Sequence, residues 1–458
     1  MDVKELQAYR RSLYQAVFTN TIPDRVPVQD SLGAEFMIQY ADKDLMITQY
    51  NFTEELIEEI YEKALIEVRR GDNFSASAAR NAVSLMLTQS LTTQMGSSGF
   101  LQHPEMTFME ADEYDEYIKN PFDFTIEKIY PRQNRQIAKG GAFRSMAIVA
   151  RMAAEADQAA MFARVTRKLV EKYGLHSEPA GASSGTQPPF DTIADFARGF
   201  SKIPMDMRRC PEKIMEAMDA LMPQLILRGI PKNPNVLGSC KIMTHMAAFL
   251  SNKQYDKFYF PHFKELHHIM AEKGVYMLDV LEQDWTRFID SLAEMPMGTR
   301  YYIEQGDAKQ FKDKLGKNFV LAGLYPITFL RAYSKEKCID KAKELMDIFA
   351  PGGNYYFAFD KTAQAPSDIN IENYIAVMEY VKENYHYDNA GETVNTAQKR
   401  EDTIIRGLAD KYPPFKSKYL PSWEEYKKEY PPTDPKAEPY MKAAYEKYMA
   451  RLGLGTSY

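Results

Sequence analysis

The sequence predicts an α/β protein, and within that class a (β/α)8 TIM barrel with a helical N-terminal extension and a C-terminal arm. From about residue 235, short apolar runs alternate with amphipathic helical stretches, which is the order of parallel strands joined by right-handed crossovers. No GxGxxG or GxxxxGK[ST] motif supports a doubly wound nucleotide-binding sheet instead. The 458 residues suffice for one large barrel with extensions.

The first half is mainly helical. Residues 4–19 and 53–70 carry apolar side chains at three- and four-residue spacing, as amphipathic helices do, and Arg25–Val28 indicates a short extended segment between them. A long helix is expected over Ala142–Lys172, where Ala, Met and Arg predominate and Pro is absent. Gly174 is placed to end it.

The second half supplies the clearest strands. The apolar runs predict strands at Val275–Leu281, Arg300–Glu304, Asn318–Gly323 and Asn354–Phe359. Helices are expected near 259–273, 284–294, 307–315 and 334–349. The Gly-, Ser- and Pro-rich stretch Gly181–Pro189 indicates a loop.

Three regions follow from this pattern. Residues 1–72 are expected to form the helical extension and first barrel segment, residues 73–409 the barrel, and residues 410–458 the arm. Trp423 and several tyrosines favour an arm docked on the barrel or on a neighbouring subunit over a solvated tail. A homo-oligomer therefore stays open.

Charge and composition exclude several kinds of partner. The 57 Lys+Arg and 63 Asp+Glu residues are mixed along the chain, so no binding to nucleic acid or to an anionic membrane is expected. There is no apolar run long enough for a membrane span or a signal peptide, and three scattered cysteines fit a reducing compartment. We expect a cytoplasmic protein whose partner is a small molecule or another protein.

Polar side chains follow the predicted strands at the ends where barrel enzymes carry their reactive groups. His245, Glu282, Glu304 and Asp360 occupy these positions and should point to one rim. Three of them, His245, Glu282 and Glu304, could hold a zinc ion and leave a position open for substrate. The competing interpretation is that acidic residues here only cap the following helices.

Aromatic residues near the same strand ends could form the wall of a substrate pocket. Tyr325 and Phe359 are the best candidates for contact with a planar substrate, beside Asp360.

Taken in order, the motifs resemble those of the uroporphyrinogen decarboxylase superfamily, and within it the corrinoid-dependent methyltransferases that demethylate methoxylated compounds. The residues that carry the resemblance run over most of the chain: Asp24–Val28, Met109–Asp115, Asn120-Pro121, Pro131-Arg132, Phe258–Pro261, Leu281–Trp285, Leu292–Pro296, Asp307 with Gly316, Ala350–Gly353, Glu372-Asn373 and Pro421–Tyr426. The resemblance implies a (β/α)8 barrel with its chemistry at the carboxyl ends of the strands.

Departures from the family pattern reduce the number of activities that the resemblance implies. The segment Val28–Gly33 has no arginine to pair with tetrapyrrole carboxylates, so uroporphyrinogen is not an expected substrate. The His-x-Cys pair of the thiol-methylating members is missing, which disfavours activation of a thiol. Relatives carry Glu-Gly at Glu282-Gln283 and Gly-Asn-Val-Pro at Gly323–Pro326.

What remains resembles the methyltransferase component of an O-demethylase, which moves a methyl group from a small methylated donor to the cobalt(I) of a corrinoid (cobalamin). No Asp-x-His-x-x-Gly motif is present, so the corrinoid should arrive on a separate carrier protein. The departing oxygen needs a zinc ion or a proton from a glutamate of raised pKa, and the sequence leaves both open.

Two other functions stay open at this point. The donor could be a quaternary amine or other onium compound, which leaves as a neutral molecule and would favour an aromatic cage. A degenerate barrel that only binds a ligand is the third hypothesis, motivated by the altered segments after Glu282 and Gly323.

Overall fold

The computed structural model describes residues 1–77 and 80–455 and has a five-stranded parallel sheet of order β3-β4-β5-β6-β7. The strands are β3 (Ser184–Thr186), β4 (Cys240–Thr244), β5 (Met277–Asp284), β6 (Arg300–Gln305) and β7 (Val320–Gly323). Each strand is joined to the next by a crossover that contains helices. The predicted α/β class is confirmed.

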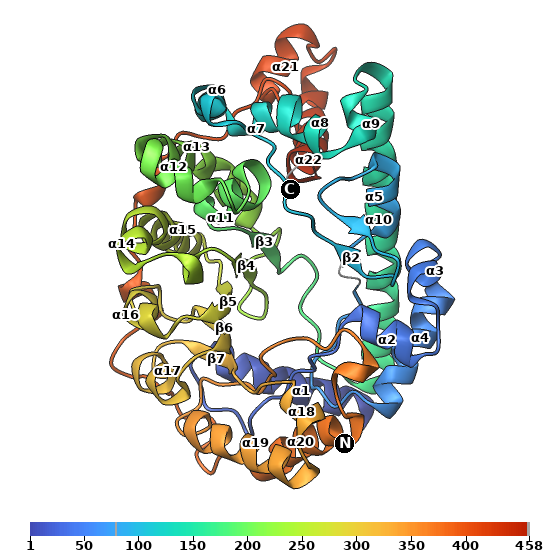
Figure 1. The fold of residues 1–458 in the computed structure, drawn as a ribbon, viewed down its shortest axis with the longest axis vertical. Coiled ribbons are helices and arrows are strands. Elements are labelled where there is room, and N and C mark those ends of the chain that lie inside the picture. The colour runs from blue at the N-terminus through green and yellow to red at the C-terminus, as the bar shows by residue number, and fades with distance from the viewer. Residues whose placement is uncertain (78–79, 456–458) are drawn as a thin grey trace.

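Helices cover the outer face of this sheet, on the left of Figure 1. They are α11 (Pro189–Ile193), α12 (Ile203–Arg209), α13 (Pro211–Gly229), α14 (Asn252–Gln254), α15 (Phe260–Glu272), α16 (Ile289–Leu292) and α17 (Ala308–Leu315). Further along the chain follow α18 (Phe329–Ala332), α19 (Lys335–Phe349) and α20 (Ile371–Asn384).

Most helices of the first half lie across from the sheet, while the helix over residues 114–119 packs on α13. The helices of this half are α1 (Val3–Phe18), α2 (Ala34–Tyr40), α3 (Leu45–Tyr50), α4 (Glu54–Glu67), α5 (Ala82–Thr88), α6 (Tyr114–Lys119), α7 (Pro121–Phe124), α8 (Tyr130–Gln133), α9 (Arg135–Ala138) and α10 (Gly141–Tyr173). A short antiparallel pair, β1 (Gln94–Met95) and β2 (Leu101–Gln102), lies among them.

Alternation along the strands separates two environments. On β5, Met277, Asp279 and Leu281 are buried beneath the covering helices, and Asp279 is bonded to His267 of α15, Oδ1 to Nε2, at 2.9 Å. The residues that alternate with these along β5, such as Glu282, are half-buried and face the opposite side of the sheet. The side chains that follow β4, β5 and β6 on this second face are therefore available for chemistry.

Single bridges extend the sheet beyond β7. The predicted strand Asn354–Phe359 pairs with its neighbours only through such bridges: Leu321 with Tyr355, Tyr325 with Phe359 and Val28 with Phe357, all parallel. Asp72 then donates its backbone N–H to the Val28 carbonyl. These pairings follow the order of a barrel, whose closure by eight strands stays a prediction.

Helix α1 packs at the amino ends of the strands. Tyr14 and Val17 are buried in a cluster with Val320 and Ala322 of β7, and the Tyr14 hydroxyl donates to the Val28 carbonyl at 3.0 Å. A capping box formed by Asp2 and Glu5 starts this helix where the spacing predicted it.

The long helix is also confirmed. Helix α10 ends at Tyr173 because Gly174 adopts the left-handed conformation at a φ of 60°. It crosses α4 through a ladder of ion pairs: Arg164–Glu54, Lys168–Glu58 and Lys172–Glu62.

Two local predictions are corrected. The stretch Gly181–Pro189 contains β3, because Ser184, Gly185 and Thr186 pair with β4 despite their low hydrophobicity. The helix expected over 284–294 shrinks to α16, since β5 continues through Asp284 before the chain turns. In both places, pairing with a neighbouring strand determines the structure, and the local amino-acid composition does not.

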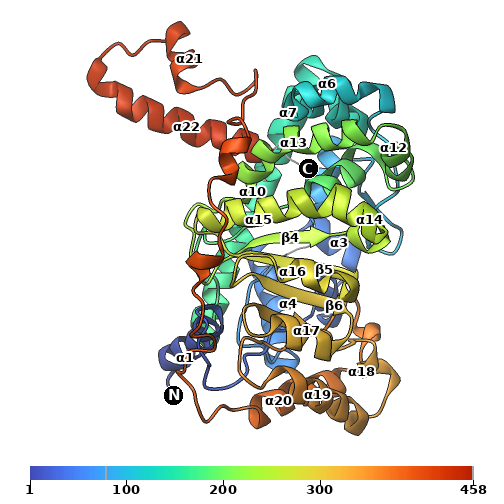
Figure 2. The ribbon, with the colours of Figure 1, turned by 90° about the vertical axis from the view of Figure 1, so that its left-hand side faces the viewer.

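The C-terminal region divides into a docked part and a projecting part. Tyr412 donates a hydrogen bond to Glu265 of α15, and Ser417 donates one to Asp123 of α7 at 2.5 Å. Helices α21 (Trp423–Glu429) and α22 (Glu438–Gly455) then project from the body, at the upper left of Figure 2. None of the helices in the described ranges has the length and apolar character that crossing a membrane requires.

Candidate functional site

The carboxyl ends of β4, β5 and β6 bring three of the predicted residues to one edge of the sheet, which we call the rim. His245 directly follows β4, Glu282 lies near the end of β5, and Glu304 lies near the end of β6. The Nε2 atom of His245 is 3.4 Å from Oε1 of Glu282. Parallel pairing in register accounts for this convergence, because Thr244 is paired with Leu281 and Leu281 with Ile303.

Two aspartates hold the His245 segment in place. The Nδ1 atom of His245 is 2.7 Å from Oδ2 of Asp195. Asp191 is fully buried and accepts the backbone N–H groups of His245 at 2.8 Å and of Met246 at 3.2 Å, together with the hydroxyl of Tyr259 at 3.1 Å. The imidazole therefore has a fixed position and orientation.

Asp195 lies in an irregular helical turn. It belongs to η3 (Ala194–Arg198), a π-helical turn that continues α11, and turns of this kind are frequent at functional sites. Asp191 and Asp195 are four residues apart, so both side chains face the segment that carries His245.

The two carboxylates beside His245 make its ring a cation. Its hydrogen bond to Asp195, followed by that to Glu282, raises the pKa of His245 to about 11. At neutral pH the imidazolium thus carries a proton on each nitrogen. The Nδ1 proton is held by Asp195 at short range, whereas the Nε2 proton lies at the longer 3.4 Å contact. The Nε2 side is the one that a bound molecule can reach.

Glu304 has different partners. Its carboxylate accepts the backbone N–H of Gln283 at 2.7 Å and forms an ion pair with Lys361, whose pKa this hydrogen bond raises. Asp360 accepts the backbone N–H of Ile327 at 2.8 Å, and burial raises the pKa of its carboxyl. Glu304, Asp360 and Lys361 all line a cavity of about 660 Å³ at this edge.

Backbone strain is stored next to these side chains. Gln283 has a φ of 62° and Leu324 a φ of 67°, in the left-handed region that non-glycine residues rarely adopt. Gln283 lies at the irregularity near the end of β5 and Leu324 directly follows β7, and Gln283 uses this conformation to donate its N–H to Glu304. Strained residues of this kind cluster at functional sites.

The predicted zinc ligands do not form a ligand set. Nδ1 of His245 is bonded to Asp195 and its Nε2 lies 3.4 Å from Glu282. Glu304 is bonded instead to the backbone of Gln283 and to Lys361. Across residues 1–77 and 80–455, no group of three or more His, Cys, Asp or Glu side chains has the arrangement needed to hold a metal ion. The three predicted ligands therefore do not form a metal-binding group in this arrangement, and a zinc ion held by them stays a prediction.

The predicted aromatic wall is corrected as well. Tyr325 and Phe359 are fully buried and pack on each other with ring centroids 5.0 Å apart. The Tyr325 hydroxyl donates to the Cys338 carbonyl at 2.9 Å. Their side chains lie on the face of the sheet that α18–α20 cover, so these rings belong to the core.

Sequence reasoning missed Asp191, Asp195 and Lys361. The two aspartates precede His245 by about fifty residues, and only the fold brings them to it. Lys361 directly follows the predicted Asp360, and this adjacency is the signal in the sequence that places it at the rim.

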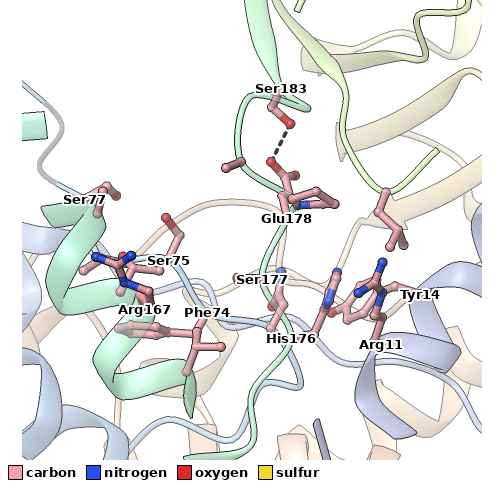
Figure 3. A pocket seen from close by; sticks show the side chains of 18 of the residues that line it. Arg11, Tyr14, Phe74, Ser75, Ser77, Arg167, His176, Ser177, Glu178 and Ser183 are labelled. Carbon is pink, nitrogen blue, oxygen red and sulfur yellow. Dashed lines mark hydrogen bonds between the residues drawn. The ribbon is translucent and has the colours of Figure 1, made fainter. Parts of the chain in front are cut away.

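A second, larger cavity of about 1310 Å³ lies away from the rim (Figure 3). Its strand residues come from the amino ends: Leu278 of β5, Arg300 of β6 and Tyr356 of the bridged segment. Helices α1 and α10 form other parts of its wall. His245, Glu282 and Glu304 do not line it.

Comparison with known proteins gives one line of evidence, which concerns the fold. The structure is similar to that of a methyltransferase from Methanosarcina mazei, with a TM-score of 0.53 over 82% of this chain and 97% of that one. The two sequences are 12% identical. No protein-family model matches the chain, and no curated protein matches it in sequence. The likeness shows that this chain shares the fold of that methyltransferase.

Proposed function

We propose that the protein is a methyltransferase that moves the methyl group of a small methoxylated aromatic compound to the cobalt(I) of a corrinoid carried by a separate protein. The observation that carries the proposal is the His245 imidazolium held between Asp195 and Glu282 at the carboxyl ends of the strands. The family resemblance and the likeness to a solved methyltransferase point to the same reaction class.

The chemistry requires an acid at the departing oxygen. The cobalt(I) corrinoid supplies the nucleophile when its carrier is bound. As the methyl carbon is attacked, the C–O bond breaks and its electron pair moves onto oxygen. The Nε2 proton of His245 then hydrogen-bonds to that oxygen and is transferred to it, so a neutral phenol leaves.

Asp195 and Asp191 act through His245. Asp195 stabilises the imidazolium and directs its Nε2 proton toward the substrate, as a carboxylate does for a catalytic histidine in other enzymes. Asp191 fixes the backbone on which the ring is carried. Both are positioning residues.

A methyl ether fits this site better than an onium donor. A quaternary amine leaves as a neutral molecule and has no use for a proton donor, whereas an aryl ether depends on one. Tyr325 and Phe359, which were predicted to contact a planar substrate, lie in the core and are not available to form a cage. A ligand-binding role without chemistry leaves the charged His245 unexplained.

The rim is accessible to a carrier protein. In Figure 2 the strands run toward the right, and helices α21 and α22 project on the opposite side, so the arm does not close this face. Phe249, which follows His245 by four residues, is 61% exposed and stacks edge-on with Phe200 at 5.0 Å. An exposed aromatic pair beside the site suits a transient protein contact.

The experiment is to mix the purified protein with cobalt(I) cobalamin and each member of a panel of methoxyarenes, and to measure methylcobalamin by absorbance. We expect methylcobalamin and the matching phenol in equal amounts from at least one donor. A quaternary ammonium panel serves as the control. Methylcobalamin from the ammonium donors alone, or from neither panel, would contradict the proposal.

A further inference from the structure

The cavity of about 1310 Å³ at the amino ends of the strands has a wall rich in cations. Arg11 of α1 and Arg167 of α10 lie on either side of it in Figure 3, and both are exposed. In the part of the chain that the structure describes, neither guanidinium has a carboxylate within ion-pair distance. Two arginines directed at one space without counter-charges favour an anionic occupant.

Arg300 is a further, buried cation in this wall. Its side chain is 2% exposed, its Nη2 donates to the Val236 carbonyl, and its Nε has no hydrogen-bond partner. Its Cζ lies 3.6 Å from the centroid of the Phe18 ring, and no carboxylate of the described residues pairs with it. A buried charge without an anion is costly, and an anion bound in the cavity would offset that cost.

The wall of this cavity contains fewer carboxylates than cations, and two of these carboxylates already have partners. Glu155 forms an ion pair with Arg151, and Glu178 accepts the Ser183 hydroxyl. Glu171 is the third carboxylate, against four cations: Lys4, Arg11, Arg167 and Arg300. The balance of charge remains positive.

Neutral hydrogen-bond donors complete the wall. Ser75 and Ser77 lie near Arg167, and Ser177 lies near the centre of the view in Figure 3. His176 is buried against the Tyr14 ring, and burial, followed by the charge of Arg11, lowers its pKa to about 4. It is therefore neutral at physiological pH and can donate one hydrogen bond.

We propose that this cavity is a binding site for a small molecule that carries a phosphate or carboxylate group, with Arg11 and Arg167 as its charged contacts. The site is separate from the rim and does not depend on the methyl-transfer proposal. Its volume of about 1310 Å³ leaves room for more than the anionic group itself.

Isothermal titration calorimetry tests the site with two probes, pyrophosphate for the phosphate class and citrate for the carboxylate class. The variants are Arg11→Gln, Arg167→Gln and the double substitution. Arg331→Gln is the matched control, because Arg331 is an exposed arginine of α18 outside the cavity. Arg300 is left unchanged, since its burial makes it a risk to folding.

We expect at least one probe to bind the wild type, with each single substitution weakening it about tenfold and the control leaving it unchanged. Binding of one probe alone identifies the class of anion, and binding of both identifies the shared chemistry. Failure of both probes to bind, or equal binding by the double variant and the Arg331→Gln control, would overturn the proposal.

Discussion

His245 is charged because the carboxylates of Asp195 and Glu282 lie beside its ring. The charge depends on Asp195, which stands fifty residues earlier and reaches Nδ1 at 2.7 Å only through the fold. Glu282 and Glu304 were placed correctly at strand ends, whereas Glu304 turned out to be held by Lys361. A sequence pattern predicts which helix or strand a residue belongs to. It does not predict which side chain from a distant element will contact that residue.

The charge of His245 should make stability depend on pH. Its folded pKa of about 11 lies above the value of about 6.5 for an unfolded histidine, so its stabilising effect is complete below about pH 6.5. That effect is lost as the pH rises from there through the folded pKa. In urea unfolding, the free energy of the wild type should fall more between neutral and alkaline pH than that of His245→Gln.

A matched control for this comparison is His386→Gln, which removes an exposed histidine. It should follow the wild type across the same range. Identical pH curves for the wild type and His245→Gln would contradict the predicted charge.

Gln283 offers a test of strain at the rim. Relatives in the resembled family carry glycine at this position, and the φ of 62° supplies the physical reason. Gln283→Gly should raise the free energy of unfolding by about 1 kcal/mol, because the left-handed conformation costs a side-chain-bearing residue about that much. The same change at Gln310, an exposed position in α17, should lower it by about 1 kcal/mol. Urea unfolding of both variants checks the pair, and a loss of stability in Gln283→Gly would contradict the account.

Whole elements were predicted well where the apolar pattern is strong. Helices α1, α10 and α19 and strands β5, β6 and β7 fall within a few residues of their predicted bounds. Strand β3 was missed because Ser184, Gly185 and Thr186 carry almost no apolar surface. Its hydroxyls are bonded to α13 instead, Ser184 to the Gly229 carbonyl and Thr186 to the Leu225 carbonyl.

The junction of β6 and β7 is expected to tolerate no side chain at Gly323. This residue has a φ of 94°, and a Cβ atom built there would lie 2.2 Å from the Ile303 carbonyl oxygen. Gly323→Ala should therefore cost more than about 2 kcal/mol of unfolding free energy. Gly352→Ala is the control, since its φ of 76° is similar and nothing lies within 4 Å of the added atom. Equal losses in the two variants would show that the close approach is unimportant.

At the scale of the whole molecule, the α/β class could be predicted from the sequence. The docking of the C-terminal arm could be predicted only in part. The expected docking holds for residues near Tyr412 and Ser417. Trp423, which favoured docking in the sequence, is instead buried by contacts within the arm, with Tyr426 and Tyr445. A tryptophan in the sequence predicts that its side chain will be buried, but it does not predict which segment of the chain will cover that side chain.

Removal of the projecting helices should therefore leave the body intact. A chain that ends at Leu420 keeps the contacts of Tyr412 and Ser417 and loses only α21 and α22. Its thermal unfolding midpoint and its rate of methylcobalamin formation should match those of the full chain. A chain that ends at Asp410 also loses the docked contacts, and its midpoint should be lower. Loss of activity on truncation at Leu420 would place the arm in the site.

The central claim is that His245 protonates the departing oxygen, and the most direct measurement is the rate of methylcobalamin formation over a series of methoxyarenes whose phenols differ in acidity. In the wild type the rate should depend weakly on phenol acidity, because His245 neutralises the developing charge. In His245→Gln it should fall steeply for the least acidic phenols. Equal dependence on phenol acidity in the two proteins would contradict the account.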